Sequence, residues 1–350
     1  MPLSPAAARP LGLALGVVAD ALLADPRRYH PVAGFGRAAQ ALERRLHADA
    51  VAPGAVFTTV AVGVPWLLGV AAERVTARRP LARVAVTAVA TWAVLGGTSL
   101  AREGQVMAGL LDAAQSDAAG AATSDAARAG IGAEETPALQ QARARLSHLC
   151  ARDPSQMSVG DLARATVESL AENTSDAAVA PLLWGAVAGV PGLLAYRAAN
   201  TLDAMVGYTS PRYLRFGRVS ARFDDLVNLV PARVTGLLTV AAAPVVGGSV
   251  ASGWRVLRAD GARHPSPNAG RPEAATAGVL GVVLGGENVY AGRVERRPGM
   301  GVGGRAPRAA DVRRAVRLGR VVVAEGALVA VGLAAVLARR ASRGGRAARS

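Results

Sequence analysis

The chain has 350 residues, of which 51% are hydrophobic and only 4% are aromatic, and its formal net charge is +15. This length allows two soluble domains or one membrane-embedded unit, and the mean hydropathy of +0.27 favours the membrane. All 40 basic residues are Arg. The absence of Lys excludes a Lys Schiff base and a P-loop of the GxxxxGKS/T type, so a bound nucleotide would depend on Arg, backbone N–H groups and metal.

The distribution of charge and the cysteine content exclude further classes of function and site. The Arg residues are dispersed and lack an aromatic-interleaved basic platform, so we expect no nucleic-acid partner. A soluble, Arg-rich nucleic-acid binder is the alternative, and the apolar stretches argue against it. Cys150 is the single cysteine, which excludes an intramolecular disulfide and a CxxC metal site.

Six apolar stretches are candidate membrane helices. They are rich in Ala, Val and Gly, which allow helices to pack closely in lipid. Most are near the length of about 20 residues that a spanning helix needs, and the first is short. They cover residues 11–24, 55–72, 81–100, 177–199, 232–251 and 317–338. The fold class predicted is all-α, a polytopic integral membrane protein with helical cytoplasm-facing loops.

The first stretch and the prolines qualify this prediction. Asp20 lies inside the first stretch, which argues against a secretory signal and leaves a buried soluble helix as an alternative. Pro181, Pro191 and Pro244 lie inside apolar stretches, so we expect some spans to be broken or re-entrant. The positive-inside rule places residues 73–83 in the cytoplasm. We expect a multi-pass protein of the cell membrane with its active site on the cytoplasmic side, and the number and orientation of the spans stay open.

The whole chain, residues 1–350, is expected to form a single membrane-embedded domain. Within it, residues 101–166 predict a hydrophilic helical insertion with a mobile middle at 112–136, which is rich in Ala, Gly, Ser and acidic residues. The Arg-rich residues 340–350 predict a flexible basic tail. Two prolines predict an ordered turn at 25–32. Helices outside the apolar stretches are predicted over residues 35–46, 137–149 and 159–170.

The acidic residues Glu168, Glu172 and Asp176 follow one another at intervals of four. On an α-helix this spacing stacks them on one face, with Asn173 and Thr174 beside them. Oxygen ligands at the mouth of an apolar helix suit a hard cation such as Mg²⁺. The alternative is a solvated helix end.

Two further polar blocks carry candidate functional groups. In the first, Asn200 and Asp203 lie one helical turn apart. Further oxygen ligands follow at Asp224, Asp225 and Asn228, and Arg222 and Arg233 are available for phosphate. Salt bridges at a membrane interface are the alternative interpretation of this block.

The second block runs over residues 264–273, where close prolines stiffen a loop around Asn268 and Gly270. Such a loop directs several N–H groups at one spot and predicts an anion site. His264 could act as an acid or base, or could bond the backbone. Gly285 and Gly286, before Asn288, permit close backbone approach to a ligand.

Taken together, six blocks resemble the CobD/CbiB family, the adenosylcobinamide-phosphate synthases of cobalamin biosynthesis. They follow one another between about residues 12 and 335. The blocks cover residues 25–32, 168–176, 200–208, 221–233, 264–274 and 284–292. The chain departs from the family at 299–304, where a glycine-rich segment replaces a frequent acidic residue.

The resemblance implies ATP-dependent amide-bond formation. The carboxylate of adenosylcobyric acid would be joined to aminopropanol or to its phosphate ester, through an acyl phosphate or an acyl adenylate. ATP and Mg²⁺ are the implied cofactors, and the corrinoid and aminopropanol-type molecules are the substrates. Membrane lipid is an expected partner, and a second protein of the cobalamin pathway is a further one. A non-catalytic corrinoid transporter or membrane subunit, and an inactive relative, are the alternatives.

Roles for individual residues follow from the resemblance and from residue type. The metal ligands are predicted to be Glu172, Asp176, Asp224 and Asp225. Glu168 or His264 would serve as the base, beside a loop from Ser266 to Gly270. Groups that orient or bind substrate are predicted to be Asn173, Asn200, Asp203, Tyr208, Arg222, Arg233, Ser266, Asn268, Gly270, Glu273, Asn288 and Tyr290.

Overall fold

The computed structural model describes residues 7–26, 30–122, 136–290 and 293–347. Contacts divide the chain into two compact units, each assembled from stretches that are far apart in the sequence. Unit 1 comprises Met1–Thr98, Ser175–Ala232 and Val323–Ser350, and unit 2 comprises Ser99–Thr174 and Arg233–Val322. The single domain expected from the sequence stays a prediction.

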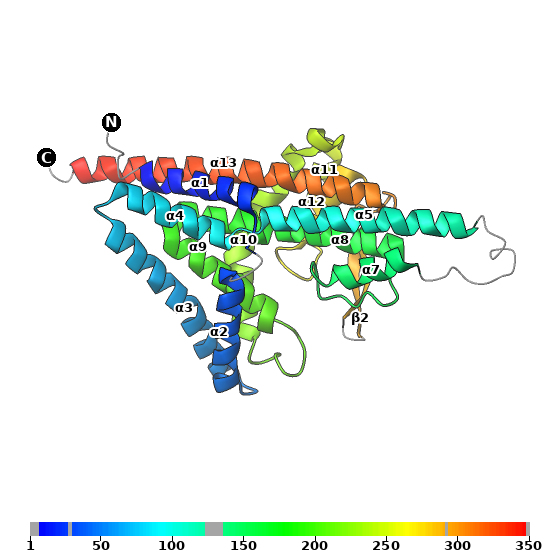
Figure 1. The fold of residues 1–350 in the computed structure, drawn as a ribbon, viewed down its shortest axis with the longest axis horizontal. Helices are drawn as coiled ribbons and strands as arrows, with labels where there is room; N and C mark the ends of the chain where they lie inside the picture. Colours follow the sequence, from blue (N-terminus) through cyan, green and yellow to red (C-terminus); the bar gives the residue numbers. More distant parts are fainter. Residues whose placement is uncertain (1–6, 27–29, 123–135, 291–292, 348–350) are drawn as a thin grey trace. The chain divides into compact units, whose positions relative to one another are not determined.

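In the described residues of unit 1, all regular secondary structure is helical (Figure 1). Its elements are α1 (Ala8–Leu23), α2 (Pro31–Leu46), α3 (Val51–Thr76), α4 (Pro80–Val94), η2 (Ser175–Val179), α9 (Ala180–Val206), the first part of α10 (Arg218–Ala241) and the last part of α13 (Ala309–Ala347). Small residues let α1 pack tightly on α4: a Cβ at Gly12 would come within 2.5 Å of the Thr87 Cβ. Pro31 occupies the first turn of α2, and the His30 ring caps it by accepting from the Val32 N–H at 3.1 Å.

The long apolar segment around α9 is broken at two places, as its prolines predicted. A π-helical turn, η2, precedes α9, and Gly189 inside α9 has φ 68° and ψ −149°. The break frees the backbone N–H of Val190, which donates to Glu73 Oε1 of α3 at 3.1 Å. Glu73 also accepts from Arg83 at 3.1 Å and lies 3.9 Å from Arg9. The broken helix is therefore held by a half-buried ion pair network rather than by its own backbone.

Among the residues that the structure describes, four helices are long and apolar enough to cross a membrane. They cover Val51–Thr76, Pro80–Asp117, Val159–Val206 and Ala309–Ser342. The prediction of an all-α, polytopic membrane protein is thus confirmed, although two of the six apolar stretches are not among these four. Residues 11–23 of the first stretch lie in α1, which has only 16 residues. Residues 232–251 are interrupted, because α10 ends at Ala241 and a short 3-10 turn, η3 (Ala243–Val246), leads to left-handed Gly247.

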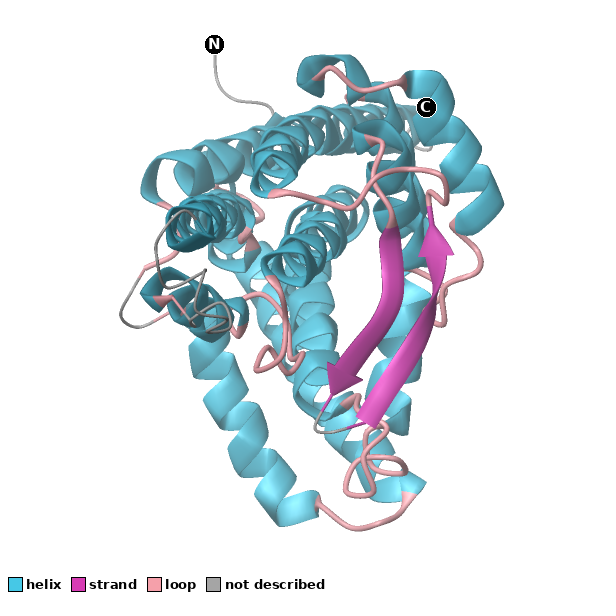
Figure 2. Ribbon diagram, turned by 90° about the vertical axis from the view of Figure 1, so that its right-hand side faces the viewer, coloured by secondary structure: helices cyan, strands magenta, loops and turns pink. Residues whose placement is uncertain are grey.

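Unit 2 combines helices with one β-hairpin (Figure 2). The helices are α5 (Gly97–Ala122), α7 (Pro137–Leu146), α8 (Val159–Thr174), α11 (Val250–Asp260) and α12 (Gly270–Leu280), together with parts of α10 and α13. The strands β1 (Leu284–Tyr290) and β2 (Arg293–Met300) pair antiparallel, with Gly286 opposite Arg297 and an irregularity between Leu284 and Gly286. The sequence analysis did not predict this hairpin.

Two segments expected to be mobile begin or continue as helix. The segment 112–136 starts within α5, which continues to Ala122, and residues 123–135 lie outside the described part of the chain. The C-terminal segment 340–350 starts within α13, which continues to Ala347, while residues 348–350 lie outside it. The helical part of the first segment, 112–122, is rich in Ala, and that of the second, 340–347, is rich in Arg; both residues are strong helix formers.

Replacing Glu73 by Ala tests the network at the break in α9. The substitution removes the acceptor for the Val190 N–H and leaves Arg83 without its carboxylate. We expect the free energy of unfolding to fall by about 1–3 kcal/mol, the cost of leaving buried polar groups unpaired. The measurement is the midpoint of thermal unfolding of the full chain in detergent. Glu287→Ala is the matched control, because Glu287 is 61% exposed and its removal should change the midpoint little. Equal midpoints for the two variants would contradict the role given to Glu73.

Candidate active site

In the described part of the chain, most of the predicted site residues lie in two clusters of buried and half-buried polar side chains, one in each unit. The Asp224 cluster of unit 1 consists of Asp176, Tyr196, Asn200, Asp203, Asp224 and Asn228. The Glu168 cluster of unit 2 consists of Arg152, Arg164, Glu168, Glu172, His264, Glu273, Asn288 and Arg297. Most of these residues come from the polar blocks of the sequence.

The Asp224 cluster lies where α10 buries a polar stripe against η2 and α9. Asn228 Nδ2 donates to Asp224 Oδ2 at 3.0 Å, and Asn228 Oδ1 accepts from the Tyr196 hydroxyl at 2.8 Å. The same hydroxyl lies 3.2 Å from the backbone oxygen of Asp176. Asn200 also bonds Asp224, so side chains from α9 and α10 converge on this carboxylate.

Two properties of Asp224 favour a cation beside its carboxylate. Burial, and next the negative charge of Asp203, raise the pKa of Asp224 to about 7, against the hydrogen bonds from Asn228 and Asn200. Its Oδ1 is buried without a hydrogen-bond partner. A cation would relieve both the repulsion and the unpaired oxygen, so Mg²⁺ fits these donors.

The cluster is not a closed metal cage. Within the described part of the chain, no group of three or more His, Cys, Asp or Glu side chains is arranged to hold a metal. Mg²⁺ is commonly held by one or two carboxylates together with water and substrate phosphates, which agrees with this arrangement. The predicted set of four ligands is divided between the units, because Glu172 belongs to unit 2 and the others to unit 1. A metal shared by all four stays a prediction.

An Arg-lined cavity of about 640 Å³ lies at the N-terminal end of α10. Its wall includes Arg215, Arg218 and Arg222, with Tyr208 and Asp225. Asp225 therefore faces away from Asp224 and lies 4.0 Å from Arg222. Arg222 was predicted for phosphate, whereas Arg215, in the turn before α10, and Arg218, its first residue, were not identified because their spacing is not distinctive.

In unit 2, Glu168 of α8 is 1% exposed and has both carboxylate oxygens engaged. Oε2 pairs with Arg152, and Oε1 accepts from the Gly285 N–H at 2.6 Å. Arg164, one turn earlier on α8, donates to the Gly285 and Glu287 carbonyls and to Asn288 Oδ1. This pairing makes Glu168 a positioning residue for the hairpin and a poor candidate for the base.

Glu273, at the start of α12, is 1% exposed, and its Oε1 has no hydrogen-bond partner. Burial, followed by the charges of Glu168 and Glu172, raises its pKa well above the usual value, although Arg297 and Arg152 oppose this. Its surroundings therefore favour the protonated form of Glu273, which can donate a hydrogen bond, as a carboxylate could not.

His264 is neutral and presents a donor. Burial, and next the charge of Arg297, lower its pKa to about 4. Its Nδ1 accepts from the Ser266 N–H at 3.0 Å, so the proton is on Nε2, which is buried without a partner. Gly270 is required beside it, because a Cβ there would come within 2.4 Å of the His264 Cβ. Ser266 Oγ accepts from the Asn268 and Ala269 N–H groups, which orders the loop.

The chain matches the CobD/Cbib protein family model over residues 13–128 and 118–319. The chain belongs to the CobD/Cbib family. It is 49% identical to the cobalamin biosynthesis protein CobD of Mycobacterium tuberculosis H37Rv over 324 residues, which is 92% of this chain and 95% of the relative. Proteins of the same name from Geobacter metallireducens and Chromobacterium violaceum are 42% and 39% identical, over 81% and 88% of this chain and 84% and 91% of their own length. No solved structure matches the chain.

The remaining predicted site residues lie at the edges of the clusters. Asn173 bonds back to Ser169 on its own helix at 2.9 Å. Arg233 is exposed beside Arg271, whose pKa is lowered by burial and then by the charge of Arg233. Asn268 is buried in the His264 loop. Tyr290 is the last residue of β1, and its side chain lies outside the described part of the structure.

Several Arg residues of the site were missed from the sequence. Arg152 and Arg164 lie in stretches without a recognisable motif, and Arg297 follows another Arg in a hairpin that the sequence analysis did not predict. In unit 1, Arg197 faces Asp25 and Asp176 beside the Asp224 cluster. A signal was available for Arg197 alone: a charged residue within an apolar membrane segment is expensive and usually functional.

The environment of His264 generates a prediction on pH. The folded protein keeps His264 neutral down to about pH 4, whereas an unfolded chain takes up this proton near pH 6.5. Because the unfolded state binds more protons between these values, stability falls as pH drops from about 6.5 to 4, by up to about 3 kcal/mol from this group. We expect His264→Gln to remove that part of the dependence, measured as the change in unfolding midpoint between pH 7 and pH 5.

The control for this measurement is His148→Gln, because the His148 side chain is 53% exposed. This variant should retain the wild-type dependence on pH. Other groups, Glu273 among them, contribute to the slope in all three proteins, so only the difference between proteins reports on His264. A slope for His264→Gln that equals the wild-type slope would show that His264 is solvated in the folded state.

Proposed function

We propose that this protein acts in cobalamin biosynthesis by joining the carboxylate of adenosylcobyric acid to aminopropanol or its phosphate ester, with consumption of ATP. Membership of the CobD/Cbib family and the names of its relatives, cobalamin biosynthesis protein CobD, support the pathway. The observation that carries the chemistry is the pair of clusters. In the Asp224 cluster, a buried carboxylate oxygen without a hydrogen-bond partner suits a cation. In the Glu168 cluster, the protonated groups of His264 and Glu273 can donate to an anion.

Activation of the substrate carboxylate is assigned to unit 1. Asp224 and Asp203, with Asp176 nearby, hold Mg²⁺, which offsets the charge of the ATP phosphates when bound. Arg215, Arg218 and Arg222 bind phosphate oxygens in the cavity that they line, because Arg forms paired hydrogen bonds with phosphate. In this step a carboxylate oxygen of the corrinoid bonds to the γ-phosphorus, the bond to the β-phosphate oxygen breaks, and ADP leaves.

Acyl transfer is assigned to the Glu168 cluster. Protonated Glu273 and the His264 Nε2–H donate to the carbonyl oxygen as it gains negative charge. Glu172, which is half-buried beside them, takes a proton from the ammonium group so that the free amine can attack the carbonyl carbon. Phosphate leaves, and Arg297 and Arg152 offset its charge. Asn288 Nδ2, buried without a partner, is a further donor to substrate.

The alternative function is that of a non-catalytic corrinoid transporter. The broken helix α9 favours it, since many transporters bind substrate at discontinuous helices. Product formation separates the two functions. A transporter would bind the corrinoid without forming an amide and without consuming ATP in proportion to it.

Replacing Asp224 by Asn tests the assignment. The full chain in detergent is incubated with adenosylcobyric acid, Mg²⁺–ATP and aminopropanol, in parallel with aminopropanol phosphate, and products are followed by mass. We expect Asp224→Asn to lower the rate of amide formation roughly 100-fold or more, as for loss of one electrostatic stabiliser of a transition state. The nucleotide product identifies the route, because an acyl phosphate yields ADP and an acyl adenylate yields AMP.

The matched control is Asp117→Asn, which changes an exposed carboxylate on α5 and should leave the rate unchanged. Full activity of Asp224→Asn would contradict the metal assignment while leaving the ligase function intact. Binding of the corrinoid by a folded wild-type protein that forms no amide with either amine would contradict the ligase function itself.

A further inference from the structure

Between the exposed Arg222 and Arg233, helix α10 carries polar residues on its inner face and apolar residues on its outer face. Ser220, Asp224 and Asn228, spaced four residues apart, are 1%, 9% and 2% exposed. On the opposite face Leu226 and Val230 are 62% and 67% exposed. A helix that borders water shows the reverse pattern. The exposed face of α10 in unit 1 is therefore suited to contact with hydrocarbon.

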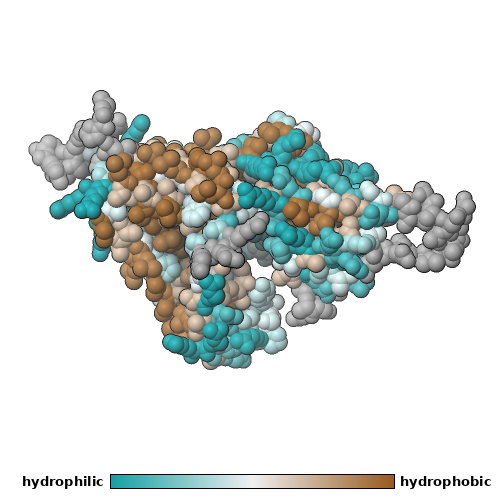
Figure 3. Space-filling view, viewed as in Figure 1, coloured by the Kyte–Doolittle hydropathy of each residue, from teal (hydrophilic) through white to brown (hydrophobic). Residues whose placement is uncertain are grey.

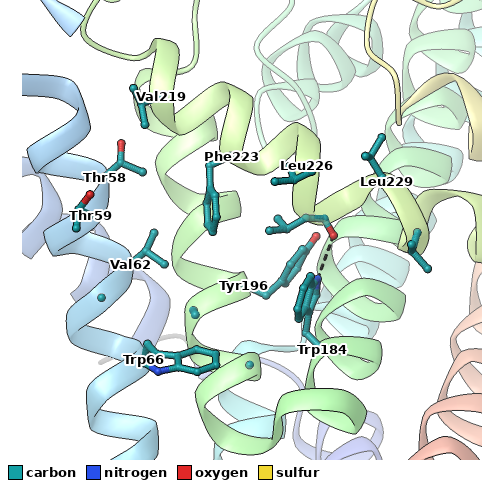
Figure 4. Close-up of a pocket in the computed structure, with 15 residues that line it drawn as sticks. Thr58, Thr59, Val62, Trp66, Trp184, Tyr196, Val219, Phe223, Leu226 and Leu229 are labelled. Carbon is teal, nitrogen blue, oxygen red and sulfur yellow. Dashed lines mark hydrogen bonds between the residues drawn. The ribbon is translucent and has the colours of Figure 1, made fainter. Parts of the chain in front are cut away.

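This apolar face forms one wall of a groove with a volume of about 750 Å³. The volume lies within the range of about 300–1,000 Å³ that is usual for small-molecule sites. Figure 4 shows Val62 and Trp66 of α3 across the groove from Phe223 of α10, with Trp184 and Tyr196 of α9 at its floor. All three helices contribute these residues from within unit 1.

The groove is continuous with the surface that α3 presents to the bilayer. Only 22% of the most apolar part of α3 is buried, and Val64 and Leu67, beside the groove residues, are 51% and 64% exposed. Figure 3 shows apolar residues following α3 over most of its length. Because α3 is long and apolar enough to cross a membrane, hydrocarbon chains of the bilayer reach the groove from the side.

Three of the five polar side chains that line the groove, those of Thr58, Trp184 and Tyr196, are already paired. The Thr58 hydroxyl bonds the Gly54 carbonyl and the Ser220 hydroxyl, each at 2.8 Å. Trp184 Nε1 donates to the Val227 carbonyl at 3.0 Å, and the Tyr196 hydroxyl is turned toward Asn228. These paired groups offer no hydrogen bond to the amides of a corrinoid, so an occupant without polar groups is favoured.

We propose that this groove binds one acyl chain of a membrane phospholipid, held between α3 and α10 against Trp66, Trp184 and Phe223. The acyl chain fills an apolar space that water would otherwise occupy, and it covers the outward face of α10. Since Asp224 and Asn228 lie on the opposite face of the same helix, the lipid supports the position of the Asp224 cluster. The binding itself does not depend on the proposed reaction.

The test uses the full chain in nanodiscs that contain phosphatidylcholine with a diazirine in the middle of one acyl chain. After photolysis, labelled residues are located by peptide mass spectrometry. Gly63 of α3 lines the groove, and a Cβ there meets no atom within 4 Å, so Gly63→Leu fills the groove without a clash. We expect Gly63→Leu to lower labelling of Trp184 and Phe223 about tenfold, equivalent to about 1.4 kcal/mol of binding free energy.

Two controls separate a bound chain from the surrounding bilayer. Leu328 of α13 is 75% exposed and reports lipid at the outer surface, so its labelling should be the same in both proteins. Gly332→Leu on α13, where a Cβ also meets no atom within 4 Å, should leave groove labelling unchanged. Groove labelling that Gly63→Leu does not lower would overturn the proposal. So would its displacement by adenosylcobyric acid, which would identify the groove as a substrate site.

Discussion

The pairing of Glu168 is the interaction on which the site in unit 2 depends. A carboxylate that is 1% exposed costs several kcal/mol unless it is paired and hydrogen-bonded. Arg152 and the Gly285 N–H meet that requirement from two directions, so the loop before α8 and the start of β1 must converge on α8. Gly285 can do so because it adopts φ 87° and because it lacks a Cβ, which would lie 2.3 Å from the Pro298 carbonyl oxygen. The hairpin then brings Arg297 close enough to Glu172 and Glu273 for its charge to act on both.

The spacing of the acidic residues in the sequence predicted part of this arrangement and missed the rest. Glu168 and Glu172 lie one turn apart on α8, so both belong to the same cluster, as the interval of four predicts. Asp176 falls within the π-helical turn η2, where each turn contains more residues and the face rotates. Asp176 therefore belongs to the Asp224 cluster of unit 1. Nothing in the spacing signals a π-turn, so this division could not be predicted from the sequence.

The membrane helices were easier to predict than the hairpin, for a physical reason. A spanning helix needs about 20 apolar residues, and that composition is visible in the sequence without knowledge of tertiary contacts. The strand β2 contains three Arg and a Pro, and the first residue of β1 is followed by two glycines; Gly and Pro are depleted in strands. The hairpin forms because Arg164 and Glu168 hold one end of it, and such long-range pairing leaves no local pattern. The Arg residues of the site were missed for the same reason.

Helix α10 shows why the bilayer belongs to the architecture of the Asp224 cluster. Its buried stripe of Ser220, Asp224 and Asn228 would be unfavourable in an apolar core, and its exposed Leu226 and Val230 would be unfavourable in water. Both costs disappear when hydrocarbon contacts the outer face and a polar site occupies the inner one. Trp184 links the two faces, since its ring lines the groove while its N–H bonds the α10 backbone beside Asn228. A helix with these two faces keeps a charged site within about one helix diameter, roughly 10 Å, of hydrocarbon.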